Sequence, residues 1–160
     1  MIDEVHTLIQ KYMAWLQDKT VVHRVSDEWA AITTPHLDRH NDYIRIYVRK
    51  RDDGFTLTDG GYVIDDLEQS GCPLDTPKRA ELLRTVLAGF GVRNEGGQLA
   101  VSATPESFAI RKHNLLQAIL AVDDLFYLAQ PNVASLFYED VTTWFEQNDI
   151  RYSANIKLTG

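Results

Sequence analysis

The chain has 160 residues and a formal net charge of −7, with 44% hydrophobic and 24% charged residues. This size and balance are ordinary for a folded domain with one good core, and they exclude a disordered chain. Both halves of the sequence are mildly acidic and mixed in sign. That charge distribution argues against a protein that binds nucleic acid by general neutralisation of phosphates.

The single cysteine, Cys72, cannot form an internal disulfide. The sequence shows neither a signal peptide nor an apolar run long enough to cross a membrane, so we expect a cytoplasmic protein without a membrane partner. Cys72 lies between Gly71 and Pro73 and lacks the Cys/His surroundings of a nucleophile. We therefore predict that it is a small buried residue.

The first part of the chain predicts a helix and two strands. Apolar residues recur every three or four positions from Ile2 to Gln17, which is typical of an amphipathic helix that packs one face on its domain. The segments from Thr20 to Val25 and from Trp29 to Thr34 are rich in β-branched and aromatic residues. They predict two strands joined by a polar turn at residues 26–28.

The most regular pattern lies between Asn41 and Gly71. Side chains alternate strictly from Tyr43 to Arg49, which predicts a strand with one buried and one solvated face. The expected buried residues are Ile44, Ile46 and Val48, and the expected solvated residues are Tyr43, Arg45, Tyr47 and Arg49. Asp52-Asp53-Gly54 then predicts a hairpin turn with a positive φ, and the chain returns along Phe55 to Thr58.

A glycine step follows the hairpin. We expect Asp59 to cap a short helix that ends near Gly71, and Gly60 and Gly61 to provide the sharp turn into it. At least one of these glycines should adopt a backbone conformation that is open mainly to glycine. Asp65 and Asp66 are then acids of the first helical turn, favoured there by the helix dipole.

The remaining elements are mostly helical. Thr76 and Pro77 predict a helix start, and Gly91 predicts its end. A Glu95-Gly96-Gly97 turn predicts a small hairpin, and Thr104-Pro105 predicts the start of the longest helix, with a kink near Asp123. A further helix from Ser135 to Gln147 and a closing strand from Tyr152 to Leu158 complete the chain.

Together these elements predict an α+β fold. A small antiparallel sheet is packed by helices and is followed by a helical hairpin and a final strand. We expect one domain over residues 1–104, with the N-terminal helix packed on the sheet. Residues 105–160 would carry the hairpin and the strand, as the possible start of a second domain of a longer protein.

Four sequence segments resemble a bacterial family catalogued as domain of unknown function 1828: residues 32–35 (ITTP), 38–42 (DRHND), 44–47 (IRIY) and 57–61 (LTDGG). The resemblance covers residues 28–102. Residues from about 108 to 160 look like the opening of domain of unknown function 1829, which often follows it. The resemblance implies an origin in bacteria, phages or other mobile elements. It implies no catalytic residue, because the family carries no established activity.

Two clusters of candidate metal ligands follow from the residue types. His36, Asp38, His40 and Asp42 occupy every second position, so an extended segment would point all four to one side. The competing interpretation is a polar loop in which the aspartates bond backbone amides, and we favour it. Asp42, Asp59 and Asp65 would form an acidic pocket for a divalent metal if they converged.

A metal-dependent nuclease or phosphatase is therefore the alternative function. It is weakened because no lysine has an acidic residue two positions before it, as a common nuclease core requires. The helix-capping roles available to Asp59 and Asp65 also compete with metal binding. We favour no catalytic residue and no cofactor.

The remaining candidate is the side of the predicted strand that carries Tyr43, Arg45, Tyr47 and Arg49, named here the Tyr/Arg face. Aromatic rings interleaved with arginines can stack bases or bind an acidic partner, and they are also compatible with a solvated sheet surface. We predict a non-catalytic module that binds a macromolecule, a protein before a nucleic acid, in a bacterial defence, counter-defence or regulatory setting. The sequence does not predict an oligomeric state.

Overall fold

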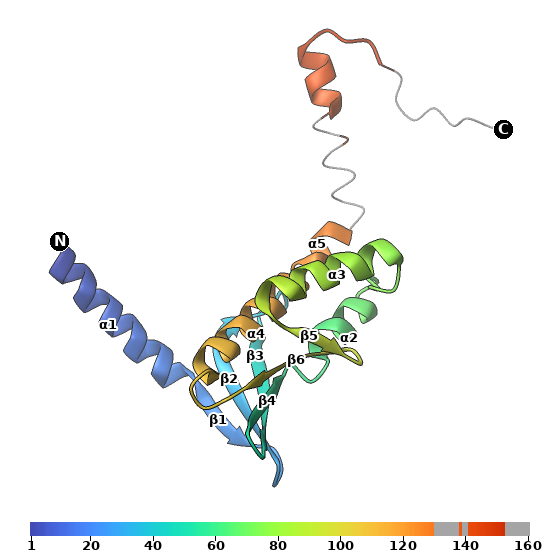
Figure 1. Cartoon of the computed structure of the whole chain (residues 1–160). Helices are drawn as coiled ribbons and strands as arrows, with labels where there is room; N and C mark the ends of the chain where they lie inside the picture. The colour runs from blue at the N-terminus through green and yellow to red at the C-terminus, as the bar shows by residue number, and fades with distance from the viewer. Residues whose placement is uncertain (130–137, 139–140, 153–160) are drawn as a thin grey trace. The chain divides into compact units, whose positions relative to one another are not determined.

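The computed structural model describes residues 1–129, 138 and 141–152. The chain divides into two compact units, Met1–Phe126 and Tyr127–Gly160. The first unit is an α+β domain built on one six-stranded antiparallel sheet with strand order β1-β2-β3-β4-β6-β5 (Figure 1). Its strands are β1 (Val21–Arg24), β2 (Trp29–Leu37), β3 (Tyr43–Arg51), β4 (Gly54–Thr58), β5 (Arg93–Glu95) and β6 (Gln98–Ala103).

Helix α4 (Phe108–Asp123) packs along one face of the sheet, against β3, β4 and β6. Helices α2 (Tyr62–Gln69) and α3 (Pro77–Phe90) pack in turn on α4. The core between these helices and the sheet contains fully buried apolar side chains, among them Ile46, Leu57, Leu67, Leu99, Leu115 and Val122. The predicted fold class is confirmed, because the alternating strands and the apolar helix stripes form the two layers that they indicate.

Helix and turn signals act largely as expected. The Thr76 hydroxyl accepts the backbone N–H of Arg79, Pro77 is the first residue of α3, and Gly91 ends it at φ 65°. Helix α4 starts later than the predicted start at Thr104-Pro105. Thr104 and Ser107 hydrogen-bond to each other in a turn, and the helix begins after that turn, at Phe108. It also stops at Asp123, where we expected a kink, and α5 (Leu125–Ala129) follows.

The hairpin between β3 and β4 forms at the predicted position, but for another reason. Gly54 does not adopt a positive φ, so the expectation of a primed turn was wrong. A side chain at Gly54 would instead collide with the carbonyl oxygen of Ala103 on β6. Glycine is required here by the close approach of two strands, not by the conformation of the turn.

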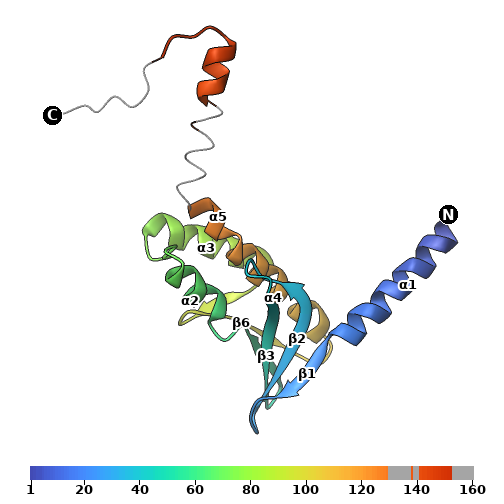
Figure 2. The same ribbon diagram turned by 180° about the vertical axis from the view of Figure 1, so that it is seen from behind.

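Helix α1 (Ile2–Lys19) forms as predicted, but it does not cover the sheet. No residue of α1 is buried, and the helix extends away from the sheet (Figure 2). The expectation that its apolar face packs on the domain is therefore wrong for the single chain.

The division of the chain also differs from the expected boundary after residue 104. Because α4 supplies core residues to the sheet, the first unit continues to Phe126. In the second unit, residues 138 and 141–147 are helical, and Phe145 contacts Trp144 and Tyr152 with ring centroids 5.6 and 5.4 Å apart. The predicted closing strand lies outside the described residues after Tyr152. Among the described helices, none combines the length and the apolar character needed to cross a membrane.

Candidate functional site

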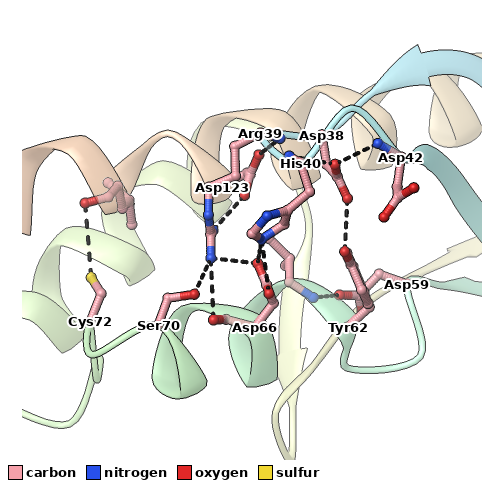
Figure 3. Close-up of polar contacts among 12 residues, drawn as sticks. Asp38, Arg39, His40, Asp42, Asp59, Tyr62, Asp66, Ser70, Cys72 and Asp123 are labelled. Carbon is pink, nitrogen blue, oxygen red and sulfur yellow. Dashed lines mark hydrogen bonds and ion pairs between the residues drawn. The ribbon is translucent and has the colours of Figure 1, made fainter.

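Asp38 organises the loop that joins β2 to β3. Its Oδ1 atom accepts the backbone N–H groups of His40 and Asp42 at 2.8 and 2.9 Å, and its Oδ2 atom accepts the Tyr62 hydroxyl at 2.8 Å (Figure 3). Burial acts to raise the pKa of Asp38, but the hydrogen bonds from Asp42, Tyr62 and His40 together lower it below its ordinary value. The predicted Asx-type role of Asp38 is confirmed. The bond to Tyr62 also fixes the loop to the start of α2.

Arg39 ties the same loop to the helical layer. Its side chain is only 5% exposed and forms ion pairs with Asp123 at 2.7 Å and with Asp66 at 2.5 Å. It also donates to the Ser70 hydroxyl at 2.7 Å, and its guanidinium lies 4.5 Å from the centre of the Phe126 ring. Burial raises the pKa of the Asp123 carboxyl despite the bonds from Arg39. Arg39 therefore joins the loop to α2 and α4, and its function in the fold is structural.

Asp59 is the second buried carboxylate near the loop. It is 2% exposed and accepts three backbone N–H groups, those of Gly61 and Leu99 on Oδ1 and that of Val63 on Oδ2. Burial raises the pKa of this carboxyl above its ordinary value, against the effect of those hydrogen bonds. Asp59 thus accepts a backbone N–H group at the start of α2, and through Leu99 it also connects this helix start to β6. The N-cap residue of α2 is Gly61, and Asp59 acts as a cap from two residues before it by accepting the N–H of Val63.

The glycine step after Asp59 lies against Tyr47 of β3. Gly60 and Gly61 have φ angles of 72° and 89°, so the prediction of a glycine-specific conformation is confirmed at both positions. A Cβ atom on Gly60 would lie 3.1 Å from the ring of Tyr47. The absence of a side chain at Gly60 therefore lets the Tyr47 ring lie against the backbone.

The Tyr/Arg face has the predicted alternation. Ile44 and Ile46 are buried on the side of α4, whereas Tyr43 and Arg45 are exposed. Tyr47 and Arg49 are half-buried, as is Val48, which we expected to be fully buried. The pairing register of β2 and β3 places one further residue on the Tyr/Arg face, which the sequence analysis did not include. Trp29 of β2 pairs with Arg49, and the Arg49 guanidinium lies 5.0 Å from the centre of its ring.

A pocket of about 370 Å³ opens beside the first half of β3, named here the β3 pocket. It exists because β4 pairs only with Tyr47 to Arg51, which leaves β3 without a strand neighbour on that side from Tyr43 to Ile46. The buried side chains of Ile44 and Ile119 form the apolar part of its lining. The polar lining comes from Thr33, Asp38, Asp42, Tyr43, Arg45, Tyr47, Asp59 and Tyr62.

A second hollow of about 430 Å³ shares Tyr47, Asp59 and Tyr62 with the β3 pocket. Trp29 and Asp65 also line this second hollow. Tyr62 therefore borders both depressions, and it is 48% exposed while its hydroxyl is bonded to Asp38. Burial, the bond to Asp38 and the nearby carboxylates raise the pKa of Tyr62, so its hydroxyl remains a hydrogen-bond donor at neutral pH.

The candidate metal ligands do not converge. Asp38 is occupied by three donors, and His40 instead lies 3.2 Å from Asp66. His36 lies near Lys112 and His113, where burial and these two groups lower its pKa. Within residues 1–129, 138 and 141–152, no three His, Cys, Asp or Glu side chains are placed to hold a metal ion.

The alternative acidic pocket has a related weakness. Asp42 and Asp59 both line the β3 pocket, and Asp59 and Asp65 both line its neighbour. Asp59 is already engaged by three backbone N–H groups, which leaves it a poor metal ligand. Asp65 is the acid of the first turn of α2, as predicted, but Asp66 instead pairs with Arg39.

Comparison with known proteins places the chain in a family. Residues 34–122 match the model of a family described as "Domain of unknown function DUF1828". The match covers more than half of the chain, which therefore belongs to this family. It runs from within β2 into the last turn of α4. It therefore begins later than the resemblance noted above, which starts at residue 28, and ends beyond it, because that resemblance stops at residue 102. No curated protein and no solved structure matches the chain.

Proposed function

We propose that the protein is a non-catalytic module that binds another protein through the Tyr/Arg face and the adjoining β3 pocket. The β3 pocket carries this proposal. It combines an apolar lining, Ile44 and Ile119, with three tyrosines and an exposed arginine on the free side of a strand. Tyrosine and arginine are the residues most often found at the energetic centre of protein interfaces, because they offer rigid contact area together with hydrogen bonding.

The size and shape of the β3 pocket support a protein partner. A volume of about 370 Å³ suits one or two side chains of an inserted segment. Asp42 and Arg45 lie at the same pocket with opposite charges, so the surface can orient a partner that carries both signs. A nucleic-acid strand would instead meet carboxylates beside the arginines, and the chain as a whole is acidic.

The bonding of the aspartates supports a non-catalytic role. Asp38 and Asp59 are both engaged by backbone N–H groups, which is the arrangement of structural carboxylates. A setting in bacterial defence, counter-defence or regulation, and a cytoplasmic location, are part of the proposal. The setting is supported by the family resemblance. The resemblance to the 1829-type domain is proposed only for residues after 122, because residues 108–122 fall within the match to the first family.

Charge reversal at Arg45 tests the proposed surface. The natural protein is used as bait, and affinity for the protein it captures is then measured by calorimetry for purified components. We expect Arg45→Glu to weaken binding at least tenfold, which corresponds to about 1.4 kcal/mol. Lys78→Glu is the matched control, because Lys78 is also exposed but lies at the start of α3. It should leave the affinity unchanged.

Two results would overturn the proposal. One is equal affinity of Arg45→Glu and natural protein for the captured partner. The other is turnover of DNA, RNA or a phosphate ester in Mg²⁺, Mn²⁺ or Zn²⁺ that Asp42→Asn abolishes, which would favour the enzyme alternative. Binding that extends to any single strand and falls steeply with salt would favour nucleic acid instead.

A further inference from the structure

Helix α1 carries an apolar stripe that the described residues leave uncovered. Its apolar side chains are between 48% and 67% exposed at seven positions: Ile2, Val5, Leu8, Ile9, Tyr12, Met13 and Trp15. Soluble proteins seldom expose so continuous an apolar surface unless another molecule covers it. Helices of this length also gain most of their stability from packing rather than from intrinsic propensity. The stripe therefore indicates an interface.

The connection between α1 and β1 prevents the helix from covering its own sheet. Only Thr20 separates the two elements, whereas loops that fold a helix back onto a sheet use about 2–6 residues. Thr20 is itself fixed, because its hydroxyl donates to the Leu16 carbonyl at 2.7 Å and its N–H to the Gln17 carbonyl at 3.3 Å. Within the first unit, the described residues therefore supply no element that covers the stripe.

The spacing of the stripe is self-complementary. Ile2, Val5, Ile9, Tyr12 and Leu16 follow alternating steps of three and four, which are the a and d positions of a heptad pattern. When two copies of α1 lie antiparallel about a two-fold axis, Val5 of one faces Leu16 of the other. Ile9 likewise faces Tyr12. Smaller side chains thus meet larger ones in every central layer.

The charges on α1 favour the same arrangement. Asp3 and Glu4 lie in the first turn and Lys19 in the last. An antiparallel pair brings the acidic turn of each copy beside the last turn of the other, where Lys19 adjoins Asp18, and it opposes the two helix dipoles. A parallel pair instead places the two acidic first turns together. Lys19 also forms an ion pair with Asp18, but both side chains are exposed to solvent, so this pair contributes little energy and leaves Lys19 available for another partner.

We propose that the occupant of the α1 stripe is a second copy of the chain, and that the protein forms a homodimer through antiparallel pairing of α1. Leu8, Met13 and Trp15 widen the stripe on both flanks of the contact. The Tyr/Arg face is the other candidate surface for α1. It is disfavoured because Arg45 and Arg49 would lie under apolar side chains with their charges desolvated. The dimer leaves that face free, so each assembly presents two copies of the proposed binding surface.

Mass measurement on the whole chain tests the dimer. The chain weighs 18.2 kDa, so light scattering after gel filtration should report twice that mass. Ile9→Asp places a charge at the centre of the stripe and should give a monomer. Gln10→Asp introduces the same charge at the neighbouring position outside the heptad contact and should remain dimeric. Circular dichroism checks that both variants fold, which we expect because no α1 residue belongs to the core. A natural chain that is monomeric at every concentration would overturn the proposal.

Disulfide trapping tests the orientation. The only natural cysteine, Cys72, is 1% exposed, so introduced cysteines react selectively. Val5→Cys mixed with Leu16→Cys should form a crossed disulfide dimer. Val5→Cys alone should not, because the two copies of position 5 lie about 16 Å apart along antiparallel helices at 1.5 Å per residue. Efficient self-linking of Val5→Cys would indicate parallel pairing, and linking to Arg45→Cys would indicate docking on the Tyr/Arg face. Either result would overturn the proposal.

The test is separable from that of the proposed binding function. Arg45→Glu should weaken partner binding at least tenfold and remain dimeric, whereas Ile9→Asp should bind the captured partner with unchanged affinity per chain. A partner that is lost only with Ile9→Asp would refute the proposed binding surface but not the dimer.

Discussion

Helices α1 and α4 have similar lengths, 18 and 16 residues, but opposite environments. The apolar residues of α1 form a regular stripe, and none is buried. Helix α4 has apolar residues on more than one side, and its second half is buried at Leu115, Leu116, Ala118, Ile119, Val122 and Asp123. The comparison shows what an amphipathic pattern can predict. It indicates that one face of the helix must be buried against another surface. It does not indicate which molecule provides the cover.

The two helices also differ in how the rest of the domain holds them. Helix α4 is fixed at its end by the bonds of Asp123 to Arg39, and it packs on three strands and two helices. Helix α1 is joined to the domain through Thr20 and contacts β2. Three predictions measure this difference, beginning with the largest expected effect.

Replacing Arg39 should cause the largest loss. Arg39→Met leaves Asp123 buried without its cation, and breaking a buried pair from one side costs about 3–5 kcal/mol. Urea unfolding followed by circular dichroism measures the change. The double variant Arg39→Met with Asp123→Asn should recover part of the loss, because the uncompensated charge is then removed as well. A loss below about 1 kcal/mol in the single variant would show that Arg39 does not anchor α4.

Matched leucine truncations compare the two helices directly. Leu115 is fully buried in α4, so Leu115→Ala should cost about 2–5 kcal/mol at any protein concentration. Leu8 is 56% exposed in α1, and Leu8→Ala should destabilise the protein only at concentrations where the proposed dimer forms. Unfolding curves at two protein concentrations separate the two cases. An effect of Leu8→Ala that survives dilution would mean that α1 packs on its own domain after all.

The smallest effect concerns pH at His36 of β2, which lies near Lys112 and His113 of α4. Burial, Lys112 and His113 lower the pKa of His36, so the folded protein binds a proton at this imidazole less readily than the unfolded chain does. The unfolded chain takes up the proton near its ordinary pKa of about 6.5, so stability should fall as the pH drops below that value. His36→Gln should reduce this loss, while the carboxyl groups contribute equally to both proteins. The measurement is the unfolding free energy at about pH 7.5 and pH 5.5. Identical pH slopes would contradict the assignment.

Much of the candidate site followed from local patterns. The alternation from Tyr43 to Arg49 correctly separated the buried isoleucines from the exposed Tyr43 and Arg45. Asp59 and the two glycines after it also acted as predicted, because a strand that turns directly into a helix needs a cap and a positive φ at fixed positions. Trp29 and Tyr62 were missed, since strand register and a bond across 24 residues bring them to the site.

Most strands and helices, and the turn into α2, followed from the sequence, because helix caps, side-chain alternation and glycine conformations act within a few residues. Tertiary structure alone decided which surfaces are covered. Asp123 reaches Arg39 from 84 residues away, and Gly54 is required by a strand that is paired later in the chain. Apolar periodicity is the same whether a helix meets its own sheet or another molecule. For that reason the pattern of α1 indicated a buried face, and only the fold revealed that the described part of the chain does not bury it.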